Sequence, residues 1–82
     1  MTRLLRSHPR IEVELDPEGR LIAYRWGTLR EPVTVVGRWR IDDAWAAVPI
    51  HREYLKVIGA RWPAVLYHDR VEGTWHLERI YS

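Results

Sequence analysis

Four histidines are the residues of this chain best suited to metal or proton chemistry: His8, His51, His68 and His76. Imidazole nitrogens bind zinc or copper when two of them face one another. If the last two strands paired residues whose numbers sum to 144, His68 would lie opposite His76 with Asp69 nearby, as a metal-dependent hydrolase would require. A sum of 143 gathers more apolar side chains on one face and separates the two histidines. Because that register buries more apolar surface, we expect it, and no metal site.

Other catalytic chemistries lack their usual residues. The chain has no cysteine, and its two serines, Ser7 and Ser82, are terminal. This leaves no thiolate nucleophile and no recognisable partner pattern for a hydroxyl nucleophile. The five glycines are spread singly, so they form no loop that would cradle a phosphate. We therefore expect a protein without enzyme activity and without a cofactor.

Asp42 and Asp43 form an adjacent acidic pair. A magnesium site needs oxygen ligands that converge from more than one part of the chain. Neighbouring carboxylates more often cap a turn or face an arginine, and Arg38 and Arg40 are close in sequence. We expect this structural role for the pair.

The positive charge is concentrated at the N-terminus. Residues 1–10 hold three arginines and no acid, whereas residues 11–82 hold ten Lys and Arg against eleven Asp and Glu, which gives −1. The folded part is therefore nearly neutral. Phosphate binding would have to use the basic segment 1–10, which we expect to be flexible, or a local stripe such as Arg38, Arg40 and Arg52.

The elements that must position these residues are strands. Apolar side chains alternate with a period of two, and turn signals recur about every 8 to 15 residues. The pattern predicts one mainly β domain over residues 11–82, with six strands that form a strongly curved antiparallel sheet or open barrel and with at most one short helical turn, between Asp42 and Ala47. The expected strands span residues 11–15, 21–26, 33–41, 50–58, 63–68 and 74–81.

The first hairpin has the clearest turn. In the segment Asp16-Pro17-Glu18-Gly19, proline presets φ and glycine accepts the left-handed position that follows. Pairing the turn ends places Leu15 opposite Leu21 and Val13 opposite Ala23, so that one face of the hairpin is apolar.

Nothing in the sequence indicates export or a membrane. Residues 1–11 contain three arginines and no apolar stretch of the kind an export signal has, and no apolar run approaches the ~20 residues of a membrane helix. We expect a soluble cytoplasmic protein with no membrane partner.

The aromatic residues point to binding. The chain has five tryptophans and four tyrosines but no phenylalanine. This is more aromatic surface than a barrel of this size readily encloses, so we expect one or two of Trp26, Trp39, Trp45 and Trp62 to reach the surface. An exposed tryptophan beside an arginine could anchor a protein partner or stack on a nucleic-acid base.

Several segments together resemble a short bacterial domain of unknown function. They contain the ordered set Trp39, Arg40, Trp45, Arg52, Tyr54, Asp69, Trp75 and Leu77. The resemblance covers roughly residues 21–82. That domain occurs as a free-standing protein, and a related block ends the catalytically inactive Y-family polymerase-like subunit of the bacterial mutasome. The resemblance implies an accessory or binding role. This chain has Ala46 after Trp45 and Leu55 after Tyr54, where we would expect paired aromatics.

Two hypotheses follow. The first is a non-enzymatic interaction module that binds a partner protein or a second copy of itself through Trp39, Arg40, Trp45, Arg52 and Tyr54. The second is a DNA-repair accessory that binds single-stranded nucleic acid through Arg38, Arg40, Arg52 and Trp62.

Overall fold

The computed structural model describes residues 2–4, 7–43, 45, 47 and 49–81, with the backbone alone for residues 2–4. Seven strands run along the chain: β1 (Thr2–Leu4), β2 (Arg10–Leu15), β3 (Leu21–Trp26), β4 (Leu29–Asp43), β5 (Ile50–Gly59), β6 (Pro63–Asp69) and β7 (Thr74–Tyr81).

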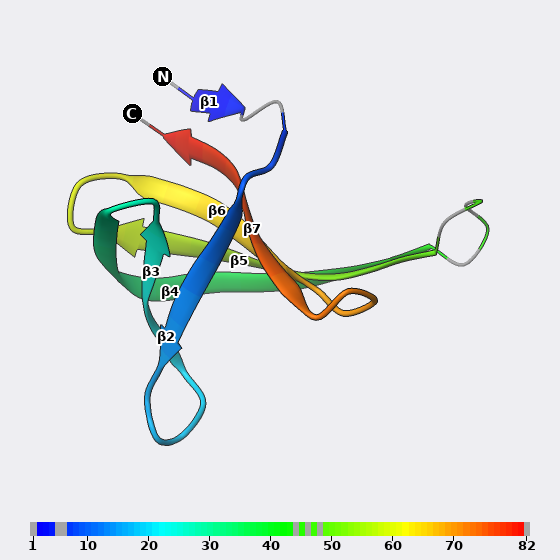
Figure 1. Ribbon diagram of the computed structural model, residues 1–82, viewed down its shortest axis with the longest axis horizontal. Coiled ribbons are helices and arrows are strands. Elements are labelled where there is room, and N and C mark those ends of the chain that lie inside the picture. Colours follow the sequence, from blue (N-terminus) through cyan, green and yellow to red (C-terminus); the bar gives the residue numbers. More distant parts are fainter. Residues whose placement is uncertain (1, 5–6, 44, 46, 48, 82) are drawn as a thin grey trace.

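Strands β2 to β7 form a closed six-stranded antiparallel barrel, in which each strand lies beside the next and β7 returns to β2 (Figure 1). This confirms the predicted single, mainly β domain. The sequence indicated no strand before residue 11, but β1 pairs with the end of β7, where Thr2 lies opposite Tyr81. The described residues contain no helix, and hence none that could span a membrane. The predicted helical turn includes residues 44 and 46, which lie outside the described ones.

The barrel interior is built by cross-strand rows of aliphatic side chains. Leu55, Leu66 and Leu77 are successive register partners on β5, β6 and β7, and each is at most 1% exposed. In the half of the last hairpin next to the turn, paired residue numbers sum to 143, as expected. A β-bulge then shifts the register, so Ala64 pairs with Ile80. The bulge increases the local twist, which helps the sheet to close.

The register predicted for the first hairpin is only partly correct. Leu15 does lie opposite Leu21, but a bulge between Glu14 and Leu15 then places Val13 opposite Tyr24 rather than Ala23. The turn itself is as expected: the Asp16 carbonyl accepts a 2.9 Å hydrogen bond from the Gly19 amide.

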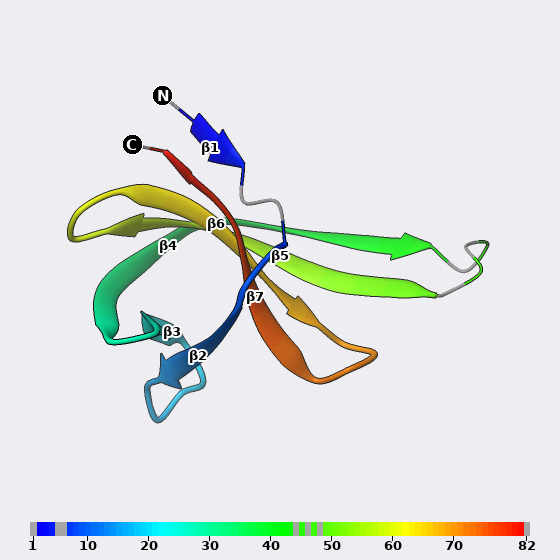
Figure 2. The same ribbon diagram turned by 45° about the horizontal axis from the view of Figure 1, so that its top comes forward.

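The β4–β5 hairpin is the longest pairing and projects well beyond the barrel (Figures 1 and 2). Its ladder runs from Val33 opposite Gly59 to Asp43 opposite Ile50. On its other edge β4 pairs with β3 only from Leu29 to Pro32. Within the described part of the chain, the edge of β4 from Val33 onward therefore has no neighbouring strand.

Candidate binding surface

A row of aromatic rings crosses the outside of the barrel. Trp39, Tyr54, Tyr67 and His76 are successive register partners on β4, β5, β6 and β7. Neighbouring ring centroids lie 5.5, 5.0 and 5.1 Å apart, and the Trp39–Tyr54 and Tyr67–His76 pairs are stacked. Because the adjacent leucine row faces inward, alternation along the strands directs this aromatic row outward.

One end of the aromatic row is open to solvent. Tyr54 and Tyr67 are 5% and 3% exposed, whereas Trp39 is 42% exposed and Ile41, two residues further along the same face of β4, is 43% exposed. Trp39, Ile41 and Tyr54 also line a hollow of about 320 Å³, together with Val65, Glu78, Arg79 and Tyr81. The outer face of the hairpin is therefore accessible apolar surface.

The opposite face of the hairpin is charged. Arg38 lies 3.7 Å from a Glu53 carboxylate oxygen, and Arg40 lies 3.5 Å from Asp42, as expected for the acidic pair. His51 shares the same Asp42 oxygen at 2.9 Å. The hydrogen bond to His51 is the main cause that lowers the pKa of Asp42, with Arg40 adding to it. These groups largely satisfy one another, so the face is a network of ion pairs.

Three of the residues predicted to form the interaction surface share one face, and two do not. Trp39, Arg52 and Tyr54 lie together, while Arg40 lies on the charged side of the same hairpin. Trp45 lies beyond the ladder and is 98% exposed, with its amide bonded to the Asp43 carboxylate at 2.9 Å.

The residues proposed for nucleic-acid contact are dispersed. Arg38 and Arg40 face away from Arg52, and Trp62 lies in the β5–β6 turn, at the opposite end of β5 from the hairpin tip. The Trp62 carbonyl accepts a hydrogen bond from the Gly59 amide at 3.0 Å, which closes that turn. The four side chains do not form one stacking and phosphate-binding surface.

Arg52 is held against the aromatic row. Its guanidinium carbon lies 4.5 Å from the centroid of the Tyr67 ring, and Nη1 donates to the Tyr54 hydroxyl at 3.3 Å. That hydrogen bond is the main cause that raises the pKa of Arg52, and burial of the guanidinium lowers it in part. Burial raises the pKa of Tyr67, against a smaller lowering by Arg52. At neutral pH the guanidinium is therefore charged and the Tyr67 hydroxyl is protonated.

A second hollow, of about 510 Å³, opens beside Arg52 on this face. The amino-acid sequence does not indicate that its lining residues come together as a group. The residues around it are Ser7, His8, Arg10, Arg52, Tyr67, Asp69, Glu72, Thr74 and His76. The predicted register, in which paired residue numbers sum to 143, already placed His76 opposite Tyr67. Nothing in the sequence linked His8 to these two residues, because 59 residues separate His8 from Tyr67.

The histidines and aspartate of the metal hypothesis do not converge. His68 pairs with Trp75 and stacks on its indole at 4.6 Å, whereas His76 pairs with Tyr67 on the other face. Asp69 accepts the amides of the next turn, Val71 at 3.0 Å among them. Over the described ranges, no three His, Cys, Asp or Glu side chains are grouped to hold a metal ion.

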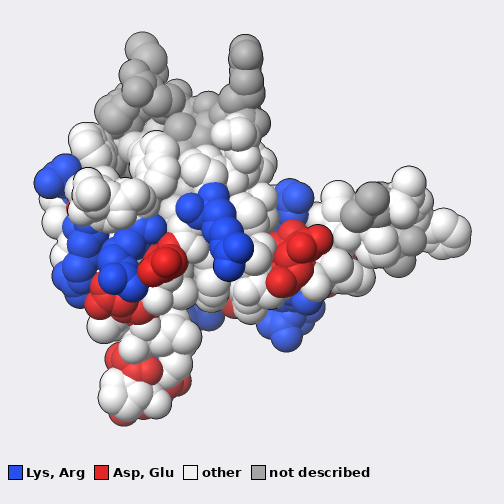
Figure 3. Space-filling view, in the orientation of Figure 1, with Lys and Arg blue, Asp and Glu red and all other residues white. Residues whose placement is uncertain are grey.

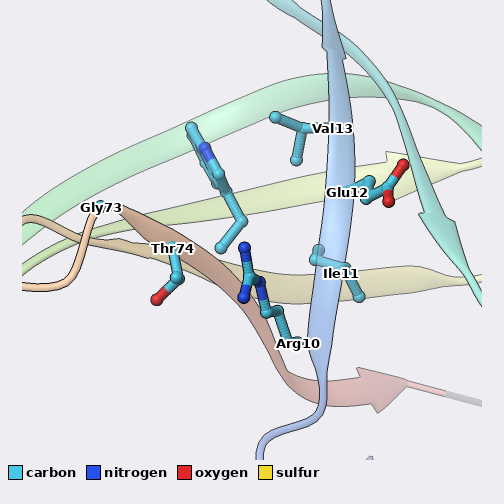
Figure 4. A pocket seen from close by; sticks show the side chains of 7 residues that line it. Arg10, Ile11, Glu12, Val13, Gly73 and Thr74 are labelled. Atoms are coloured by element: carbon cyan, nitrogen blue, oxygen red, sulfur yellow. The ribbon is translucent and has the colours of Figure 1, made fainter.

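The barrel has a seam where β2 leaves β7. Only Arg10 and Ile11 of β2 pair with β7, opposite His76 and Trp75. Beyond them the strands diverge around an opening of about 510 Å³, which Figure 4 shows between β2 and the start of β7. Its lining combines apolar groups, Val13 among them, with the polar residues Arg10 and Thr74 (Figure 4).

No family model matches the sequence, and no curated protein or solved structure matches it significantly.

Proposed function

We propose that this chain is a non-enzymatic interaction module that holds a protein, either a different partner or a second copy of itself, with the outer face of the β4–β5 hairpin. The observation that carries the proposal is the exposed apolar surface of Trp39 and Ile41 on a hairpin that extends away from the barrel (Figure 2). Large apolar side chains lose free energy when they leave water, and buried tryptophans are frequent anchors of interfaces.

The charge distribution supports a protein partner over a nucleic acid. On the face seen in Figure 3, Lys and Arg lie among Asp and Glu and do not form one continuous basic patch. Nucleic-acid binding depends on unpaired cations along the phosphate path. Here Arg38 and Arg40 already have carboxylate partners. Tyr54 and Tyr67 are too deeply buried to offer a face to a base.

The edge of β4 offers a second means of attachment. A strand edge without a neighbour presents backbone N–H and C=O groups to another chain, which can add a strand there. Such an addition would lie next to Trp39 and Ile41, so backbone hydrogen bonds and apolar contacts would act together. The resemblance of residues 21–82 to a short bacterial domain of unknown function, of which a related block ends a polymerase-like mutasome subunit, supports a binding role in general terms.

The test compares Trp39→Ala and Ile41→Ser with Trp26→Ala. Trp26 is 37% exposed on β3, so its removal deletes a similarly exposed indole away from the hairpin. Light scattering across a concentration series measures self-association, and crosslinking in cells of the source organism measures partner binding. We expect each hairpin variant to weaken the self-association, or the binding of the crosslinked partner, by tenfold or more. A tenfold weaker affinity corresponds to roughly 1.4 kcal/mol of binding free energy. Trp26→Ala should leave the affinity unchanged.

Three results would contradict the proposal. One is a monomer at all concentrations with no crosslinked partner, and another is equal loss in all three variants. The third is quenching of tryptophan fluorescence by a single-stranded oligonucleotide at low salt, which would favour the nucleic-acid alternative instead.

A further inference from the structure

We propose that the Arg52 hollow, lined by Arg52, Arg10, His8 and His76, binds the phosphate group of a small phosphorylated ligand. The proposal concerns a site beside the aromatic row and does not depend on what the hairpin binds.

The two arginines make no ion pair within 4 Å among the described residues, although Asp69, the register partner of Arg52, contributes to the rise of the Arg52 pKa. Six other arginines pair with carboxylates within 4 Å, but none of the ion pairs between described residues involves Arg10 or Arg52. Two acids also line the hollow. One of them, Asp69, uses an oxygen to accept the amides of Val71 and Glu72, at 3.0 and 3.2 Å.

Arg52 is positioned before any ligand arrives. The stack on Tyr67 and the hydrogen bond to Tyr54 fix the guanidinium plane, yet in the described part of the chain only one of its N–H groups has an acceptor. A guanidinium has five N–H donors in a planar fork that matches phosphate oxygens. Because its orientation is already fixed, less side-chain entropy is lost on binding.

Hydrogen bonds hold the two histidines that line the hollow. The His76 Nδ1 must donate to the His8 carbonyl at 3.0 Å, since a carbonyl only accepts. In neutral His76 the Nε2 then accepts from the Thr74 hydroxyl at 2.8 Å. His8 Nδ1 lies 3.2 Å from the Tyr67 hydroxyl, and when that hydroxyl donates, the neutral ring carries its proton on Nε2. In that tautomer His8 Nε2 is an N–H donor.

The backbone at His8 gives an independent indication. His8 has φ of 44°, in the left-handed region that residues with a β carbon rarely adopt. The hydrogen bonds to Tyr67 and His76 hold it there. Strained residues that specific contacts hold beside a hollow are concentrated at ligand sites.

Isothermal titration calorimetry at low ionic strength tests the proposal, with inorganic phosphate and glycerol phosphate as probes and acetate as the comparison anion. The variants are Arg52→Gln and Arg10→Gln. Arg10 is exposed, so its replacement should leave the barrel folded. Arg61→Gln is the matched control, because it removes the same charge from an exposed arginine in the β5–β6 turn.

We expect saturable binding of both phosphates that is stronger than that of acetate. Arg52→Gln should weaken it by about tenfold or more, the loss typical of a charge-assisted hydrogen bond. Arg10→Gln should weaken it in the same direction, and Arg61→Gln should not. The proposal is overturned by an absence of saturable binding, by equal weakening in Arg61→Gln, or by an oligonucleotide that binds and is not displaced by glycerol phosphate.

Discussion

Glu31 shows how a single buried charge can organise a turn. It is 1% exposed, and its Oε2 accepts the Arg61 amide at 2.8 Å in the β5–β6 turn. The turn fits closely around it: a β carbon built on Gly59 would lie 2.7 Å from that same oxygen and 2.7 Å from the Trp62 carbonyl oxygen. Gly59 is therefore required for space and not for its backbone conformation.

We predict that Gly59→Ala lowers the free energy of unfolding by roughly 1 to 3 kcal/mol, the usual cost of overpacking. The Trp62 carbonyl belongs to the backbone and cannot move aside easily. Gly37→Ala is the control, because a β carbon there meets only the Lys56 Cβ at 3.7 Å, an ordinary contact. Urea denaturation compares the two, and a Gly59→Ala variant as stable as Gly37→Ala would show that the turn can expand.

At the scale of strands, β5, β6 and β7 carry a different surface on each of their two faces. The row of Leu55, Leu66 and Leu77 faces inward, and the next row on the same strands carries the aromatic side chains outward. In the middle of the aromatic row Tyr54 and Tyr67 are 5% and 3% exposed, so at these positions β5 and β6 are covered on both sides. This explains why Tyr54 and Tyr67 are buried although they do not belong to the barrel interior.

We predict that Leu66→Ala lowers the free energy of unfolding by about 2 to 5 kcal/mol, because its neighbours on β5 and β7 cannot collapse into the cavity. Ile58→Ala provides the comparison: Ile58 is 44% exposed, so its truncation should cost less than about 1 kcal/mol. The measurement is urea denaturation monitored by tryptophan fluorescence. Equal losses in the two variants would contradict the assignment of the leucine row to the interior.

Alternation and turn residues were enough to predict six strands and the turn half of the last hairpin. They did not reveal the bulges, because a bulge changes which residues lie opposite one another across two strands, and the pattern along each strand alone does not specify that pairing. For that reason the pairing of Val13 with Ala23 was wrong. The strand β1 was missed because three residues are too few to show alternation.

The candidate sites were harder to predict than the fold. The sequence identified Trp39, Arg52 and Tyr54, which do share a face, since they lie two residues or one ladder step apart. It grouped Arg40 with them, although Arg40 directly follows Trp39 and neighbouring residues of a strand point to opposite faces. His8 was not connected with Arg52, because contacts made across the closure of the barrel carry no local pattern.

For the molecule as a whole, closure depends unequally on its ladders. The ladders that join β4, β5, β6 and β7 are long. By contrast, β2 meets β7 through Arg10 and Ile11 alone among the described pairs, supported by a 3.0 Å hydrogen bond from the Leu77 amide to the Pro9 carbonyl. The interior that this closure protects includes Tyr24 on β3, which is 2% exposed. Burial there favours the neutral form of its phenol.

Burial raises the pKa of Tyr24, and the nearby Glu31 carboxylate adds to the shift. In the unfolded chain the phenol ionises near pH 10. Above that pH the unfolded state loses a proton that the folded state keeps, so the unfolded state is favoured. The stabilising contribution of Tyr24 is therefore fully present below about pH 10 and is lost as the pH rises through the folded pKa.

We predict that wild-type stability, measured by urea denaturation between pH 8 and 11, falls more steeply with pH than the stability of Tyr24→Phe. Tyr81→Phe, which removes a hydroxyl at the end of β7, serves as the control. If the stability of wild type and of Tyr24→Phe fell with pH at the same slope, water would reach the Tyr24 phenol in the folded protein.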